Sequence, residues 1–225
     1  MYEINGQKQA LTTFQTFYFF CAGLLFNAVG NGLTVATNMG SAPWTASAAN
    51  LSLATGQSIS IFLLLYGFAA ACLTAVIIHH LDWGRFFGNM LFVILFSYII
   101  GYVNHFFVSL GIMSLPFWIR IIIDIIAIIF VGIGVSISQR LQLVLHPLDD
   151  LVVITRFKYF HGDARISQLV NFATPMIISL LVWIITRQLV ALNVGTLISF
   201  FGQGIIIQFA DKAVFKHLIH RKEMF

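Results

Sequence analysis

The sequence predicts an all-α, polytopic membrane protein that crosses the bilayer six times. Of its 225 residues, 59% are hydrophobic and only 9% are charged, and the mean hydropathy is +0.93. A soluble domain carries about 25% charged residues, so no soluble fold would bury this much apolar surface. Six apolar runs of about 20 residues, the length that spans a bilayer, follow one another along the chain. No polar stretch is long enough to form a separate soluble domain.

Short polar breaks and one longer polar segment, residues 139–165, separate the six predicted spans. The first run is too long for a signal peptide and lacks a basic segment before it, so we expect an uncleaved span. Cys21 and Cys72 lie inside apolar runs and predict neither a disulfide nor a metal site. The predicted spans cover residues 11–36, 59–78, 86–107, 117–138, 166–185 and 189–210.

A break after the first span interrupts the apolar pattern at Gly40 and Pro43, residues that do not continue a helix well. Pro43 suits the first turn of a new helix, where its missing N–H is no loss. Residues 44–55 are small and mildly apolar, so we expect a short helix whose N-terminus begins near Ser41. Such an end carries unpaired N–H groups and a partial positive charge.

The same pattern returns at Pro147, which follows a long apolar run and opens a short apolar stretch at residues 151–154. Gly30 and Gly134 each lie 13 residues before one of the two prolines. Matched spacing of this kind indicates an internal repeat. We therefore divide the single membrane domain into a first three-span repeat, residues 1–110, and a second one, residues 111–225.

An odd number of spans in each repeat inverts the second repeat relative to the first. Inverted repeats recur in secondary transporters, where broken helices meet near the bilayer midplane and point their N-termini at solute. The alternative is that both Pro-initiated helices lie flat on the membrane surface, with Trp44 as a headgroup anchor. The sequence leaves both arrangements open.

The distribution of Lys and Arg predicts the orientation, because cytoplasmic loops are enriched in both residues. With the N-terminus inside, ten basic residues lie on the cytoplasmic side and two on the outer side. This orientation explains the pI of about 9.3 without a nucleic-acid partner. We expect a multi-pass protein of the cell membrane with both termini in the cytoplasm. The inner residues are Lys8, Arg85, Arg140, Arg156, Lys158, Arg165, Lys212, Lys216, Arg221 and Lys222, and the outer ones are Arg120 and Arg187.

Three segments resemble motifs of the YczE/YyaS/YitT family of bacterial membrane proteins. Residues 39–44, MGSAPW, resemble its G-x-S-P-W-D motif, and residues 147–149, PLD, resemble its G-P-R-D motif. Residues 195–211 resemble its closing G-T…I-D span, and Thr45 stands where the family often has Asp. The resemblance covers nearly the whole chain. It implies a small, duplicated polytopic protein of a prokaryotic cytoplasmic membrane, without a defined activity.

Polar side chains within the spans supply the candidate site. Asn27, Asn31 and Asn38 recur at helical spacing and are expected to share one face. Such a stripe either joins helices through hydrogen bonds or lines a path for solute. We expect Ser41 to cap the first Pro-initiated helix and Asp149 to cap the second. The predicted solute-binding residues are Asn27, Asn31, Asn38, Ser41, Pro43, Trp44, Pro147 and Asp149.

Ionisable groups within a span are costly and usually functional. Asp124 lies one helical turn after Arg120 in the fourth span. We expect an ion pair within that helix near the outer membrane surface. The alternative is an ion relay, in which the two residues help to pass a proton or a cation.

Enzymatic motifs are absent from the sequence: it has no H-E-x-x-H, no G-x-S-x-G and no P-loop. We therefore expect no enzyme activity and no cofactor. Several His and Asp residues occur in one predicted loop, but their spacing matches no known metal motif, so no metal site is predicted. They are His146, Asp149, Asp150, His161 and Asp163.

Transport or permeation of a small polar solute is the function that this pattern favours. The alternatives are a non-transporting accessory or regulatory membrane protein and a solute-binding subunit of a larger complex with a separate ATPase. The expected partners are the lipid bilayer and an unidentified small polar solute. A homo-oligomer or a membrane partner is compatible with the sequence, and no nucleic acid is expected.

Overall fold

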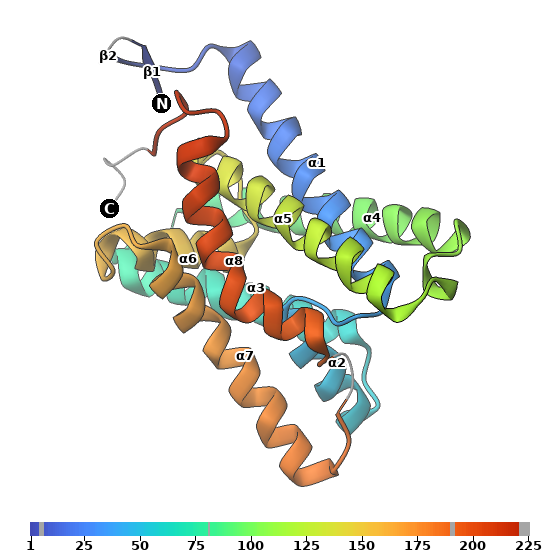
Figure 1. Ribbon diagram of the computed structural model, residues 1–225. Helices are drawn as coiled ribbons and strands as arrows, with labels where there is room; N and C mark the ends of the chain where they lie inside the picture. The colour runs from blue at the N-terminus through green and yellow to red at the C-terminus, as the bar shows by residue number, and fades with distance from the viewer. Residues whose placement is uncertain (5–6, 81, 190–191, 221–225) are drawn as a thin grey trace.

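The computed structural model describes residues 1–4, 7–80, 82–189 and 192–220, and these form a helical assembly with a small β-hairpin at one end (Figure 1). Six of the helices are long and apolar enough to cross a membrane. The predicted polytopic helical fold is therefore confirmed. The six are α1 (Thr13–Thr37), α3 (Ile59–Ile78), α4 (Trp83–Ser109), α5 (Phe117–Leu141), α7 (Ala164–Thr186) and α8 (Val194–Ala213).

Two shorter helices begin at the two prolines, as predicted: α2 (Pro43–Thr55) and α6 (Pro147–Lys158). A 3-10 turn, η1 (Ile112–Ser114), lies between α4 and α5. The hairpin consists of β1 (Tyr2–Ile4) and β2 (Gln7–Gln9), which pair antiparallel. Of the expected cytoplasmic basic residues, Arg221 and Lys222 lie outside the described residues.

Helix ends follow local capping chemistry more closely than the limits of the apolar runs. Thr12 and Gln15 form a capping box at the start of α1. Asn193 and Thr196 form another at the start of α8. The sixth span therefore begins at Val194 rather than at Leu189, because the Asn193 side chain satisfies the first free N–H groups of the helix.

Helices α1 and α5 cross antiparallel at the centre of the molecule. The Gly23 end of α1 lies against Ser138, near the end of α5. At the other end, the Thr37 hydroxyl donates a hydrogen bond to Asp124, near the start of α5. A Cβ added at Gly134 would lie only 2.3 Å from the backbone nitrogen of Asn27. The two backbones therefore touch, which only glycine permits at this position.

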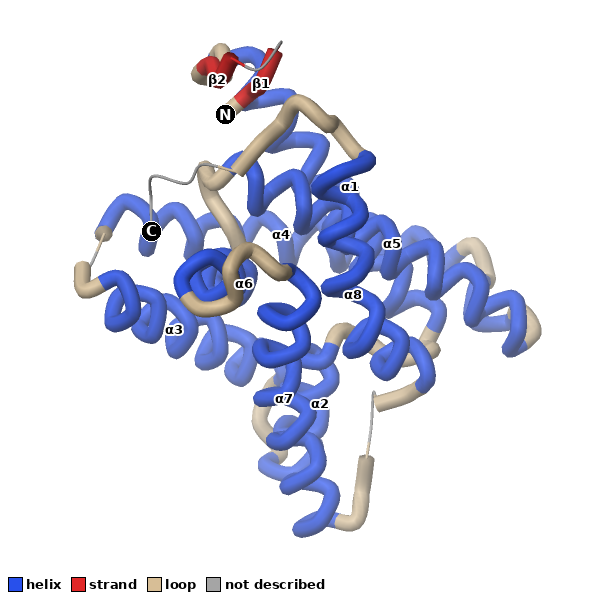
Figure 2. The backbone as a smooth tube through the Cα atoms, turned by 60° about the vertical axis from the view of Figure 1, so that its left-hand side comes forward, coloured by secondary structure: helices blue, strands red, loops and turns tan. Residues whose placement is uncertain are grey.

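The remaining helices pack in matching pairs around this crossing. Helix α4 packs on α1 as α8 packs on α5, and α2 packs on α7 as α6 packs on α3. Figure 2 shows α2 and α7 side by side. The repeat extends to loop hydrogen bonds: Ser41 N donates to Thr196 Oγ1 at 3.1 Å, and Leu145 N donates to Asn89 Oδ1 at 3.0 Å. Matched pairs about an antiparallel crossing are the packing expected of inverted repeats. The division between residues 110 and 111 stays a prediction.

The N-terminal hairpin and the segment that follows α8, residues 214–219, meet on one side of the molecule (Figure 1). Glu3 N donates to the carbonyl of His217 at 2.8 Å. Arg140, which is 1% exposed, reaches the same segment and donates to the carbonyl oxygens of Val214, Phe215 and Leu218. An even number of spans requires the two ends to share a side, although it does not say which side of the membrane that is.

Cysteine labelling in intact cells tests the predicted orientation. In a background without the two native cysteines, a cysteine at exposed Gln57 should react with an impermeant maleimide. A cysteine at exposed Lys216 should react only after the cells are lysed, because the positive-inside bias places it in the cytoplasm. Labelling at position 216 in intact cells would show that the orientation is the opposite of the predicted one.

The central crossing is tested by adding one methyl group to it. Gly134→Ala should lower the melting temperature of the purified protein, since overpacking of this kind costs about 1–3 kcal/mol. Gly101→Ala is the matched control, because a Cβ there meets no atom within 4 Å. Equal melting temperatures for the two variants would show that the packing of α1 on α5 does not require close contact of their backbones.

Candidate functional site

The first turns of α2 and α6 line one cavity of about 110 Å³. Trp44 and Thr45 come from α2, and Leu148 and Asp149 come from α6. The N-cap of α6, His146, also lines the wall, and the other polar residues come from α1, α7 and α8. They are Asn27, Asn31, Gln168, Ser199 and Gln203. The two short helices therefore point into the assembly, as the broken-helix interpretation predicts.

Proline at the first helical position shapes both cavity-facing ends. Pro43 and Pro147 are both buried and have no N–H to leave unsatisfied. The N–H groups of the next two residues have no partner within a helix, and the helix dipole adds partial positive charge there. Polar atoms of the protein, water or a solute must satisfy these groups, because lipid does not.

The predicted caps of these helices are wrong. The N-cap of α2 is Ala42, which offers no side-chain hydrogen bond. Ser41 lies one residue earlier and is held by α8, and its buried hydroxyl oxygen has no hydrogen-bond partner in the described part of the chain. The N-cap of α6 is His146, whose Nδ1 accepts a hydrogen bond from Leu148 N at 3.3 Å. Asp149 is consequently free to face the cavity from the first turn.

Two of the three members of the predicted asparagine stripe lie together in the cavity wall. Asn27 is buried, and Asn31 donates to its side-chain oxygen at 2.7 Å, so the pair forms one wall of the cavity. Asn38 lies elsewhere: it is exposed and ends α1 in the left-handed conformation at φ 51°. The helical spacing fails at this residue because the helix stops at Thr37.

Two glutamines complete the cavity wall and were not among the predicted residues. Gln168 of α7 is 3% exposed and Gln203 of α8 is 2% exposed. Within the described residues, the Gln168 Oε1 atom and both amide atoms of Gln203 have no hydrogen-bond partner. Leaving such groups unpaired inside a protein costs free energy, so these amides are available to a ligand. Their positions on two different spans give no local sequence signal.

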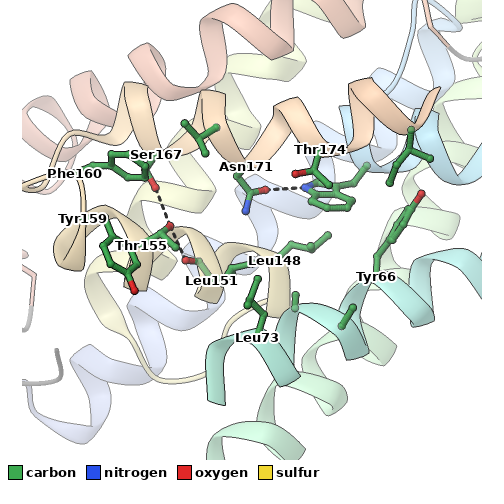
Figure 3. Close-up of a pocket in the computed structure, with 15 residues that line it drawn as sticks. Tyr66, Leu73, Leu148, Leu151, Thr155, Tyr159, Phe160, Ser167, Asn171 and Thr174 are labelled. Atoms are coloured by element: carbon green, nitrogen blue, oxygen red, sulfur yellow. Dashed lines mark hydrogen bonds between the residues drawn. The ribbon is translucent and has the colours of Figure 1, made fainter. Parts of the chain in front are cut away.

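Trp44 separates this cavity from a larger groove. Its indole N–H donates to Asn171 Oδ1 at 2.8 Å, and its ring lies 4.9 Å from that of Tyr66. The indole is therefore held between α7 and α3 within the helical assembly. The groove has a volume of about 540 Å³, and its walls are mostly apolar (Figure 3).

The charge of the cavity depends mainly on Asp149. Burial, followed by the adjacent Asp150 carboxylate, raises the pKa of Asp149 to about 7. Asp150 turns away from the cavity and accepts hydrogen bonds from Arg85 Nε at 2.7 Å and Asn89 Nδ2 at 2.9 Å. Burial lowers the pKa of His146 to about 4, so its ring stays neutral near pH 7. Asp149 is thus the group in the wall that titrates near neutrality.

The predicted ion pair within α5 does not form. Arg120 donates to the backbone carbonyl of Thr37 at 3.2 Å, whereas the Asp124 carboxylate accepts from the Thr37 hydroxyl at 3.0 Å. Both side chains turn toward the end of α1, because α1 crosses α5 at this level. Asp124 is 1% exposed and lines a second, smaller void next to the cavity.

A buried ionic cluster joins α5, α6 and α8 beside the chain ends. Asp211 accepts hydrogen bonds from Arg156 at 2.7 Å and from Ser136 at 2.6 Å. Arg140 lies 3.6 Å and His220 3.3 Å from the same carboxylate. Losing one member of such a buried network is strongly destabilising, so the cluster fixes this end of the assembly.

Six apolar spans, together with two half-helices that converge on one cavity, define a polytopic α-helical membrane protein. The chain belongs to the family of unknown function DUF6198, which matches residues 14–212. No curated protein and no solved structure matches the chain.

A pH titration tests the environment of Asp149. In the unfolded chain this carboxyl ionises near its ordinary pKa of 3.8, whereas in the folded protein it ionises at about 7. Between these values the unfolded state binds fewer protons, so the wild type should lose stability as the pH rises. Asp149→Asn should not share this loss. The difference in melting temperature between the two proteins should therefore change from pH 4 to 7 and stay constant above; a constant difference throughout would contradict the burial of Asp149.

Proposed function

We propose that this protein transports a small polar solute across the cytoplasmic membrane of a prokaryote, with both termini inside. One observation carries the proposal: the first turns of two half-helices and two unpartnered glutamine amides line the same cavity. Half-helices that meet at a central site are the substrate-binding device of many secondary transporters. The sequence motifs further support a relationship to the YczE/YyaS/YitT proteins.

The cavity limits the size of the solute. A dry cavity of about 150 Å³ holds a benzene molecule in a well-studied protein, so about 110 Å³ suits a solute of four or five non-hydrogen atoms. The first turns of the two half-helices and the glutamine amides line one part, and Phe172 and Val131 line another. A compact polar or zwitterionic molecule fits this wall, whereas a large hydrophobe does not.

The chemistry of the wall is that of binding rather than catalysis. Amides and helix ends hold a solute by hydrogen bonds, and Asp149 supplies a carboxyl that ionises near pH 7. A proton on Asp149 at that pH gives solute binding a dependence on pH. We propose no enzymatic step.

Access to the cavity alternates, in this proposal, by movement of the matched halves around the crossing of α1 and α5. Hydrogen bonds hold one side through Ser41 and Thr196 and the other through Leu145 and Asn89. In an inverted repeat these two sets lie on opposite membrane faces. Breaking one set while keeping the other opens the cavity to one side at a time.

Ligand screening and reconstitution test the proposal. A small polar metabolite that binds the folded protein should raise its melting temperature and accumulate in proteoliposomes. Gln203→Leu and Gln168→Leu should each weaken binding by about fivefold or more, since a hydrogen bond contributes about 1 kcal/mol.

Gln188→Leu is the matched control, because Gln188 is exposed and lies outside the cavity. It should bind the solute like the wild type. A protein that neither binds nor accumulates any small polar solute would instead be an accessory membrane protein or a subunit that needs a partner.

A further inference from the structure

A second polar void lies beside the cavity, between α1, α5, α8 and the loop that precedes α2. Its volume is about 10 Å³, near the smallest accessible volume that holds a single water molecule. Asn31, Ser199 and Gln203 line both the void and the larger cavity. The two spaces are therefore adjacent and share polar side chains.

Asp124 supplies the charge of this void. Its side chain is 1% exposed, and no Lys, Arg or His among the described residues forms an ion pair with it. The nearby Arg120 donates to a backbone carbonyl instead. A buried carboxylate without a cationic partner is costly inside a membrane protein, and such groups mark ion pathways.

The backbone of α8 fixes the position of this carboxylate. A Cβ added at Gly195 would lie 2.1 Å from Asp124 Oδ2, so the carboxylate packs directly on the first turn of α8. Gly195 N is itself used in a 2.8 Å hydrogen bond to Met39 O. The acid thus packs on the turn of α8 that is hydrogen-bonded to the loop carrying Ser41.

Further oxygen atoms face the same void without partners. The Ser41 hydroxyl oxygen and the Gln203 Oε1 atom are buried and have no hydrogen-bond partner in the described parts of the chain. Gln203 is only 2% exposed, so bulk water does not compensate for the missing bond. Hydroxyl, amide and carboxylate oxygens are the ligands that hard cations prefer.

We propose that this void binds one monovalent cation with the coordination chemistry of Na⁺, held by Asp124, Ser41 and Gln203. The single carboxylate balances one positive charge, whereas a divalent ion would leave a net charge buried. Gln203 also lines the solute cavity, so the ion orients an amide that contacts solute. This coupling rests on the proposed function; the binding of the cation does not.

Thermal stability of the purified full-length protein tests the site without any solute. At constant ionic strength, replacing choline chloride by NaCl should raise the melting temperature with a saturable dependence on Na⁺, because a ligand of the folded state stabilises it. Asp124→Asn should abolish this rise. Asp163→Asn should keep it, since Asp163 does not line the void and accepts a hydrogen bond from Arg165.

Milder variants keep the test decisive if Asp124→Asn fails to fold. Ser41→Ala should raise the half-saturating Na⁺ concentration about fivefold, because the lost contact with the ion is comparable in free energy to one hydrogen bond. Ser97→Ala, at an exposed serine of α4, should leave it unchanged.

Three results would overturn the cation site: no stabilisation by Na⁺ beyond that by choline, a rise that survives in Asp124→Asn, or equal half-saturation in all serine variants. The results that would refute the transport proposal differ from those that would refute the cation site. Solute uptake without any Na⁺ effect refutes the cation site alone, and Na⁺ stabilisation without uptake of any solute refutes transport alone.

Discussion

The close contact between α1 and α5 is the constraint on which the rest of the structure depends. Lipid gives apolar helices no reason to associate, so membrane helices rely on packing at small residues. Gly30 and Gly134 let the two backbones touch, and an added Cβ at either would come within 2.7 Å of backbone atoms of the other helix. This contact brings Asn27 and Asn31 into the middle of the molecule. The first turns of the two half-helices line the same cavity as these two asparagines.

Buried acids in this protein fall into two groups with different consequences. Asp150 and Asp211 are paired with arginines, and each pair joins helices that are distant in sequence. Asp124 is buried and Asp149 is half-buried, yet no arginine, lysine or histidine pairs with either among the described residues. Paired charges hold an assembly together, whereas an unpaired buried carboxyl needs a proton, a cation or a solute group. The two unpaired acids lie on the two adjoining polar spaces.

The sequence predicts the spans and the two Pro-initiated helices because span length and proline geometry are local properties. Contacts between distant segments could not be predicted in this way. Ser41 looks like a cap, but α8 holds its backbone and the cap falls to Ala42. Asp124 has Arg120 one turn away, but both turn toward α1. Gln203 likewise lies in the cavity wall only because of the helices that surround it. A single sequence does not show which helices these are.

The exchange of partners between the two halves has a consequence for biogenesis. Helix α2 packs on α7, and α3 packs on α6, so each half-helix rests on a span from the other half of the chain. During synthesis, α2 leaves the ribosome long before α7, which begins only at Ala164. Until then its exposed first turn has no final partner. The nascent chain must shelter that turn in water, at the membrane surface or within the insertion machinery, and completion of the assembly waits for the last two spans.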